Sequence, residues 1–113
     1  MSAPTKTHIA TAVTDHLPGI QRLAKEYGVA RLEVYGDAAE GELPTRDYPV
    51  DFIVTYPPGY DLGPWGGRWT ELAEALGLMV GRHASLLMST TMVESPPRRE
   101  NIEQTRQTIY VGS

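Results

Sequence analysis

Two segments with β-strand character lie on either side of a glycine turn in LEVYGDAAEGELPTRDYPVDFIVTY, residues 32–56. The first strand, expected over residues 29–35, alternates apolar and polar side chains, which is typical of a half-buried strand. The second, over residues 50–56, is β-branched and almost continuously apolar, which predicts a central position in a sheet. Because Gly36 directly follows the first strand, a tight turn is expected between the two. This pair of strands restricts the chain to folds built around a sheet.

Helical patterns occur before, between and after these strands. Residues 18–28 begin at a proline and end at Gly28, a residue suited to a left-handed helix stop. Ile20, Leu23 and Ala24 share the apolar face of this helix. Three further segments have helical spacing or helix-start signals: 8–17, 68–81 with an end near Gly77, and 95–110 with Ser95 as N-cap and Pro96 as first residue.

The order of these elements predicts the fold class. A third strand is expected over residues 83–93, whereas residues 57–67 consist of turn-forming residues in which we expect no regular element. No linker or repeat divides the 113 residues, so one domain is expected over residues 1–113. The chain therefore predicts an α/β fold, with a small mixed sheet flanked by helices on one main side.

Charge and composition limit the possible partners. The 14 acidic and 10 basic residues give a net charge of -4, and the basic residues are scattered apart from Arg98 and Arg99. Direct binding of nucleic acid is not expected, because it requires a basic patch. The absence of cysteine excludes disulfides and thiolate metal sites. No apolar run approaches the roughly 20 residues of a membrane span, and the first residues lack a signal-peptide pattern, so a soluble, cytoplasmic protein is expected.

The turn between the first two strands has the form of a phosphate-binding site. A glycine turn after a strand points backbone N–H groups at one position, and Gly36 and Gly41 bracket such a turn. In metal-dependent phosphoryl chemistry, acids at i and i+2 of the next strand hold two cations about 4 Å apart. Pro49 and Asp51 occupy those positions here, so only the second acid is present.

In YGDAAEGELPTRDYPVDFIV and VGRHASLLM, the chain resembles the minimal nucleotidyltransferases of the DNA polymerase beta superfamily. These are the MNT proteins, and the resemblance is to their MntA-like antitoxin type. The family pattern is Gly-Ser-x-x-Arg-Gly after a strand, then Ser-Asp-Leu-Asp, and a third carboxylate on a later strand. The resemblance covers almost the whole chain. It implies a nucleotidyltransferase fold and, in active members, magnesium-dependent transfer of AMP from ATP to a tyrosine of a HEPN-type toxin.

The phosphate turn departs from the family pattern. Gly36 and Gly41 keep the nucleotide-binding turn. However, Asp37 stands in place of the phosphate-binding serine, and Glu40 in place of the arginine. A triphosphate would meet two carboxylates there, which is electrostatically repulsive.

The metal-binding positions depart as well. Pro49 replaces the first aspartate of the pattern and Ser85 the third carboxylate, so Asp51 is the one vestigial catalytic acid. Magnesium prefers charged oxygen ligands, which a neutral hydroxyl supplies poorly. We therefore expect no cofactor, and magnesium and ATP only if the protein is active.

Asp37 has two interpretations. It can cap the short helix after the turn and satisfy amides that otherwise hold phosphate. It can instead bind one metal ion together with Asp51 and either Glu40 or Glu42. Asp47 lies on the same strand face as Asp51, but four strand residues span roughly 13 Å, which is too far for a shared metal.

Other residues have a structural and a functional interpretation. Three histidines lack metal-ligand spacing, and we expect surface or capping positions for them: His8, His16 and His83. Four aromatic residues suit either packing or a functional role, base stacking for the tryptophans and modification for the tyrosines: Trp65, Trp69, Tyr35 and Tyr48. We expect packing, with the tryptophans covering the helix that begins near Arg68. Arg98 and Arg99 are expected at a solvated helix start, where an acidic partner can contact them.

These features predict a degenerate nucleotidyltransferase, a pseudoenzyme that acts as a protein-binding, antitoxin-like module. Its expected partner is a HEPN-type toxin or further copies of the chain. Tyr56, Tyr60 and Trp65 are expected to supply exposed apolar surface for this contact. Two alternatives stay open: AMP transfer from ATP to a partner protein, which depends on Asp37 and Asp51, and nucleotide sensing without turnover.

Overall fold

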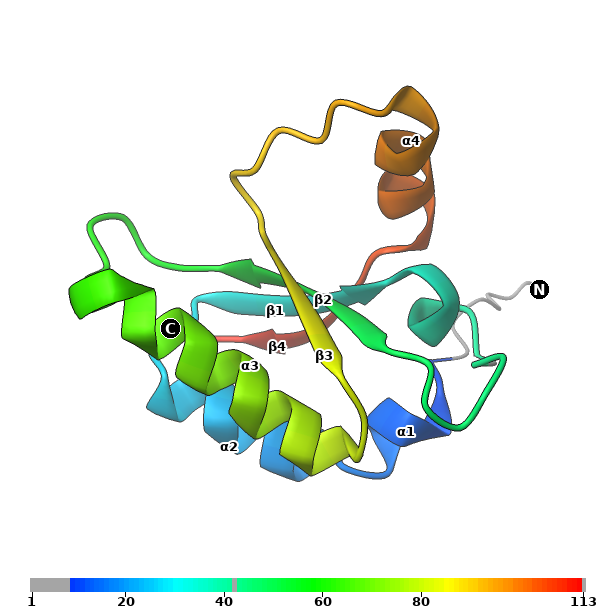
Figure 1. Ribbon diagram of the computed structural model, residues 1–113, viewed down its shortest axis with the longest axis horizontal. Helices are drawn as coiled ribbons and strands as arrows, with labels where there is room; N and C mark the ends of the chain where they lie inside the picture. The colour runs from blue at the N-terminus through cyan, green and yellow to red at the C-terminus, as the bar shows by residue number, and fades with distance from the viewer. Residues whose placement is uncertain (1–8, 42, 113) are drawn as a thin grey trace.

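The computed structural model describes residues 9–41 and 43–112, which form a four-stranded mixed sheet in the order β3-β2-β1-β4 (Figure 1). The strands are β1 (Arg31–Tyr35), β2 (Val50–Thr55), β3 (Ala84–Met88) and β4 (Gln107–Val111). β1 pairs antiparallel with β2 and with β4, and β2 pairs parallel with β3. The small mixed sheet and the central position of β2 are thus confirmed.

The helices lie on both sides of this sheet, mainly on one. They are α1 (Thr11–Thr14), α2 (Leu17–Glu26), α3 (Gly67–Val80) and α4 (Pro96–Thr105), with short 3-10 turns η1 (Gly36–Ala39) and η2 (Pro64–Gly66). In Figure 1, α2 and α3 run below the sheet and α4 stands above one end of it. Ser95 caps α4 as expected, since its side chain accepts a hydrogen bond from the Arg98 amide. In the described part of the chain, no helix combines the length and apolar character required to cross a bilayer.

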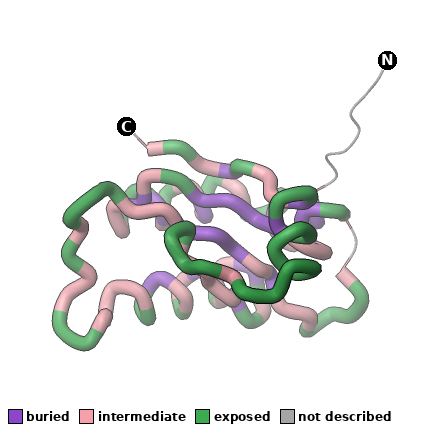
Figure 2. Tube along the Cα trace, turned by 90° about the horizontal axis from the view of Figure 1, so that it is seen from above, coloured by how far each residue is buried: buried purple, intermediate pink, exposed green. Residues whose placement is uncertain are grey.

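Each face of the sheet has its own apolar cluster. Leu32, Val34 and Phe52 belong to the larger cluster, beneath which α2 and α3 pack. Tyr35 and Ile53 belong to a smaller cluster, in which residues of α4 cover the opposite face. Figure 2 shows buried residues concentrated along the strands. The strands are therefore buried on both faces at the α4 end.

The closing helix is shorter than the sequence predicts. The helical spacing of Ile102, Arg106 and Ile109 suggests a helix to residue 110, but α4 ends at Thr105 and Arg106 has an extended backbone. The following residues, 107–111, form β4 and pair with the open edge of β1. Ile109 is buried in β4, and its position also fits the period of an apolar helix face, so its spacing alone does not distinguish helix from strand.

The boundaries of α3 also differ from the prediction. α3 continues past Gly77 to Val80 and ends at Gly81, whose φ is +74°. A Cβ at Gly77 would lie 3.1 Å from the Arg82 carbonyl oxygen, so this glycine permits close packing and does not end the helix. Upstream, residues 57–67 contain the short turn η2, although no regular element is predicted there.

A buried ion pair joins β1 to the residue after α4. Glu33 is 3% exposed, contrary to the polar strand face expected from the alternation. The Arg106 guanidinium donates from Nε and Nη2 to its two carboxylate oxygens, both at 2.9 Å. Arg106 also donates to the exposed Glu103 at 3.1 Å. The pair neutralises the Glu33 carboxylate, which is buried at the α4 end of the sheet.

We expect Arg106→Leu to lower the free energy of unfolding by about 3 kcal/mol, because the Glu33 charge would stay buried without compensation. Urea denaturation followed by circular dichroism measures this change. Glu103→Gln is the matched control, since it removes only the exposed partner of Arg106 and should cost less than about 1 kcal/mol. Equal losses in both variants would contradict a special role for the buried pair.

Candidate functional site

The glycine turn brings the end of β1 against the start of β2. Gly36 has a φ of +72°, and η1 begins with it. A Cβ at Gly36 would lie 3.5 Å from the Asp51 carboxylate oxygen Oδ2. The turn and the retained acid are therefore in direct proximity. Glycine suits this position because its backbone conformation is one that side chains with a Cβ rarely adopt.

The register of the strands places Ser85, which stands at the third carboxylate position of the family pattern, next to Asp51. Asp51 lies opposite Tyr35 of β1 and opposite Ser85 of β3. Pro49 immediately precedes β2 and offers no ligand atom. The sheet thus brings together the turn, Asp51 and Ser85, the positions that the resemblance identifies.

The remaining candidate acids have different surroundings. Glu40 is exposed at the end of η1, and Asp47 is exposed and accepts a hydrogen bond from the Thr45 hydroxyl at 3.0 Å. Gly41 has a φ of +107°, so it also supports the turn. Glu42 lies outside the described residues. Within the described loop, Asp37 is the acid that interacts with Asp51.

A threonine hydroxyl accepts a hydrogen bond from the first backbone amide of the turn. The Gly36 N–H donates to Thr105 Oγ1 at 2.8 Å, and this hydroxyl donates to the Asn101 carbonyl at 2.7 Å. Thr105 is only 5% exposed. The hypothesis that Asp37 caps η1 is wrong, because Tyr35 is at the N-cap position and no side chain caps this turn. Sequence reasoning missed Thr105, since a threonine at a helix end carries no motif.

The two carboxylates influence each other and their neighbours. Burial raises the pKa of Asp51, Asp37 raises it further, and the positive charges of Arg98 and His83 oppose the shift. A hydrogen bond to the Asp37 carboxylate raises the pKa of the Tyr48 hydroxyl, and the negative charge of Asp37 adds to the effect. The site therefore favours a neutral Tyr48 and disfavours a second negative charge at Asp51.

The donor set does not fit a two-magnesium centre. Among residues 9–41 and 43–112, no three His, Asp or Glu side chains group closely enough to hold a metal ion. Of the three acid positions that the resemblance implies, only that of Asp51 holds an acid, because Pro49 lacks a donor and Ser85 supplies a neutral hydroxyl. Two adjacent dications require more negative charge than this arrangement offers.

Basic residues border the site without lining the turn. Arg98 donates to the Tyr35 hydroxyl at 3.3 Å, and Arg99 donates to the Val93 carbonyl at 2.7 Å. Arg82, which sequence reasoning did not single out, donates from Nη1 to the carbonyls of Thr45 and Tyr48 at 3.2 and 3.1 Å. Arg82 thereby holds the loop that leads into β2.

The histidines do not form a site among the described residues. His83 is exposed next to the start of β3, and His16 is exposed at the N-cap position of α2 without a capping hydrogen bond. His8 lies outside the described residues. Surface positions for His16 and His83 agree with the expectation.

The aromatic loop after β2 is only partly the exposed surface that the sequence suggests. Tyr56 and Tyr60 stack with ring centroids 4.5 Å apart, and Tyr56 also packs against Trp69. The Arg68 Nε donates to the Tyr60 hydroxyl at 2.7 Å. Trp65, in contrast, is 101% exposed and does not cover α3 as expected. The rings of the two tyrosines hold the loop, and one indole projects from it.

The strained backbone at Trp65 adds to this contrast. Its φ of 58° and ψ of 20° are left-handed, and it is the one non-glycine residue with a positive φ in the part of the chain that the structure describes. Such a conformation costs on the order of 1–2 kcal/mol for a residue with a side chain. The fold therefore holds an exposed indole in an unfavourable backbone conformation.

Comparison with known proteins identifies the fold. No protein-family model and no curated protein matches the chain. A solved structure described as a minimal nucleotidyltransferase has a TM-score of 0.65 and 21% identity, with 84% of this chain and 90% of that chain covered. A mutant of the toxin–antitoxin pair MntA–HpeT has a TM-score of 0.64 and 13% identity, with 86% and 74% covered.

A third similar structure is the tri-AMPylated HEPN toxin of Shewanella oneidensis in complex with an MNT antitoxin. Its TM-score is 0.59 at 12% identity, with 88% of this chain and 72% of that chain covered. These likenesses establish that the chain has the minimal nucleotidyltransferase fold, as the sequence predicts.

The raised pKa of Asp51 predicts how stability depends on pH. An acid whose pKa is higher in the folded state favours folding below its ordinary value of 3.8, and this contribution is lost as pH rises through the raised pKa. We therefore expect Asp51→Asn to gain stability relative to the unmodified protein between about pH 3 and pH 7. Urea denaturation across this range measures the difference.

Asp47→Asn controls for the loss of one negative charge, because Asp47 is exposed in the preceding loop. A difference between the unmodified protein and Asp51→Asn that shrinks as pH rises would show that the folded state stabilises the charged carboxylate. That result would contradict burial as the dominant influence on Asp51.

Proposed function

We propose that this protein is a catalytically degenerate nucleotidyltransferase that acts as a protein-binding, antitoxin-like module. One observation carries the proposal: the Gly36 amide of the phosphate turn donates to the buried hydroxyl of Thr105. A phosphate group that used this amide would have to displace an internal acceptor that is already well placed. The Thr105 hydroxyl thus supports a turn whose first amide is already satisfied within the protein.

The charges around the turn support the same conclusion. Asp37 lies in the first turn of η1, where a bound phosphate would benefit from positive charge. Asp51 already has a raised pKa, to which the Asp37 charge contributes, so a further anion nearby is unfavourable. No charged ligand at Pro49 or Ser85 is available to recruit a compensating metal ion.

A protein partner is the second part of the proposal. Two of the structurally similar proteins are components of toxin–antitoxin complexes, one of them with a HEPN toxin. Trp65 projects fully into solvent from a loop that stacking and hydrogen bonds hold in place. Exposed tryptophans are enriched among residues that dominate protein–protein affinity, and a rigid anchor loses little entropy on binding. A HEPN-type toxin is therefore the partner class that we propose.

AMP transfer is the second candidate function. In the third similar structure, the HEPN toxin that is bound to the MNT antitoxin is tri-AMPylated, which is consistent with nucleotidyl transfer in that complex. In this chain such an activity would depend on Asp37 and Asp51, whose charges already influence one another. Nucleotide sensing without turnover would require the turn to open at Thr105.

We expect isothermal titration calorimetry to detect weak or no binding of ATP in the presence of magnesium or manganese, because of the closed turn and its negative charge. Low-micromolar binding would contradict the degenerate function and favour the enzyme or the sensor. Radiolabelled ATP then separates those two, since only the enzyme labels a partner protein.

The matched variant for this test rebuilds the site: Asp37→Ser, Glu40→Arg, Pro49→Asp and Ser85→Asp. Because Ser85 lies directly opposite Asp51, an acid there would join the carboxylates that the other changes supply. Catalytic groups act as a unit, so we expect Pro49→Asp alone to remain inactive and the fourfold variant to transfer AMP. Equal activity of the unmodified protein would overturn the proposal.

Trp65→Asn tests the partner contact. Asparagine tolerates the left-handed backbone, so the fold should keep its stability. We expect the affinity for a partner captured from source cells, and identified by mass spectrometry, to fall at least about tenfold. Met92→Asn is the control, because Met92 is 82% exposed on a different segment. Equal effects of both changes would argue against Trp65 as a specific anchor.

A further inference from the structure

The two edges of the sheet differ in how they are protected. At the β4 edge the register shifts beside Ile109, whose carbonyl accepts a hydrogen bond from Gln21 Nε2 at 3.0 Å. A bulge and a covering group are two ways in which proteins keep an edge strand from pairing with another chain. β3 forms the opposite edge, and its register with β2 is regular from Ala84 to Met88. β3 contains no charged residue and no proline, so its own sequence does not protect it.

The backbone hydrogen-bonding groups of Leu86 point away from the sheet. At the two ends of the pairing between β2 and β3, the Val50 N–H donates to the His83 carbonyl and the Ser89 N–H donates to the Val54 carbonyl. Because alternate residues of a strand bond to the same neighbour, the odd-numbered residues of β3 bond to β2. The N–H and C=O of Leu86 therefore face outward. Among the described residues, no hydrogen bond reaches either group.

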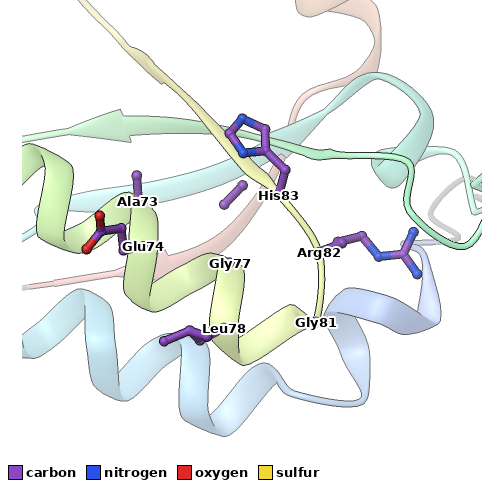
Figure 3. Close-up of a pocket in the computed structure, with 8 residues that line it drawn as sticks. Ala73, Glu74, Gly77, Leu78, Gly81, Arg82 and His83 are labelled. Atoms are coloured by element: carbon purple, nitrogen blue, oxygen red, sulfur yellow. The ribbon is translucent and has the colours of Figure 1, made fainter.

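A hollow lies next to this edge, between α3 and the start of β3 (Figure 3). Its volume is about 690 Å³, and small residues form much of its lining, among them Ala73, Gly77 and Ala84. Leu78 also lines it and is 86% exposed. Side chains at every second position of a strand point to one face of the sheet. A strand added beside β3 would therefore direct every second side chain toward α3 and this hollow.

The charges around the hollow favour a basic partner. Glu74 lines the hollow, and Glu71, one turn earlier on α3, is also exposed. Neither glutamate forms an ion pair with another described residue. Arg82 and His83 line the other end, but the Arg82 guanidinium donates to two carbonyls of the loop before β2. The α3 side of the hollow is therefore acidic, which complements a lysine or arginine.

We propose that the outer edge of β3 is a strand-addition site for an extended segment of a partner protein. The segment pairs antiparallel with β3, because one of its residues can then exchange two hydrogen bonds with Leu86. Its side chains on the α3 side are apolar and fill the hollow, and a basic residue of the segment meets Glu74. In such complexes the backbone bonds supply affinity and the alternate side chains supply specificity. The paired run is short, since the Met88 carbonyl already accepts a hydrogen bond from the Thr91 N–H at 2.9 Å.

Hydrogen–deuterium exchange followed by NMR tests whether the edge is open. In the unmodified chain we expect the Leu86 amide to exchange at least about tenfold faster than the Leu87 amide, which faces β2. Equal protection of the two amides would overturn the proposal. Protection of Leu86 that grows with protein concentration would also overturn it, because a second copy would then occupy the edge. The site lies apart from the Trp65 loop and the glycine turn, so these outcomes do not bear on the proposed function.

A phage-displayed library of random eight-residue peptides, selected on the immobilised chain, tests the occupant. We expect the enriched peptides to alternate apolar residues and to carry lysine or arginine. A synthetic copy of the most enriched peptide should slow exchange of the Leu86 amide at least about tenfold. Selection of no peptide, or binding that leaves this amide unprotected, would overturn the site.

Methylation of the peptide's backbone nitrogens, one at a time, tests the pairing. We expect binding to weaken roughly tenfold at alternate positions, the equivalent of one lost backbone hydrogen bond, and to change little at the positions between them. An equal effect at every position would contradict pairing with a strand edge.

Ala73→Gln tests the hollow, because the longer side chain would take up space that the small lining residues leave open. Thr70→Gln is the matched control, since Thr70 is exposed one turn earlier on α3 and does not line the hollow. We expect the selected peptide to bind Ala73→Gln at least about tenfold more weakly than Thr70→Gln. Circular dichroism checks that both variants fold. Equal affinities would overturn the hollow as part of the site.

Discussion

The carboxylate of Glu33 is buried in the second strand from one edge of the sheet, and Arg106, which neutralises its charge, lies at the junction between α4 and β4. Arg106 reaches Glu33 at the point where α4 stops at Thr105 and the chain turns into β4. The same stop places the Thr105 hydroxyl on the Gly36 amide. Two adjacent residues thus join the end of α4 both to β1 and to the glycine turn that follows it.

The contact between Thr105 and the glycine turn adds to the effect of the residues that depart from the family pattern. Pro49, where the family pattern has an acid, offers no metal ligand, but it leaves the turn itself intact. The Thr105 contact acts on the turn directly, because it satisfies the first amide from inside the protein. Asp37 then adds negative charge where a phosphate would need the opposite, and its carboxylate interacts with Tyr48. In the proposed degenerate site, both charge and hydrogen bonding therefore disfavour a bound phosphate.

Much of the fold could be predicted from local patterns. The strands on either side of Gly36, the Ser95 cap and the α/β class depend on signals within a few residues of each other. The resemblance assigned Asp51 and Ser85 to positions of the family's acid pattern, and the register places the two residues side by side. Their chemical role stays a prediction, because register describes position and not activity.

Other features could not be predicted, and the reasons are physical. The Glu33 and Arg106 side chains are 73 positions apart in sequence, so no local pattern connects them. Ile109 fits the period of a helix and that of a strand equally well, and the outcome depends on the free edge of β1. Trp65 has a large apolar side chain of the kind that is usually buried, but it lies in a turn with glycines on both sides and its side chain projects into solvent.

The long separation between β1 and β4 also has a consequence for folding. Until residues 105–111 reach the sheet, β1 has an open edge and Glu33 lacks its guanidinium partner. Contacts of such high sequence separation form slowly, because the intervening chain must first be ordered. An intermediate without β4 would expose a hydrogen-bonding strand edge to other molecules. The Glu33 charge would face solvent at that stage, and a charge beside an open edge discourages the strand from pairing with the wrong chain.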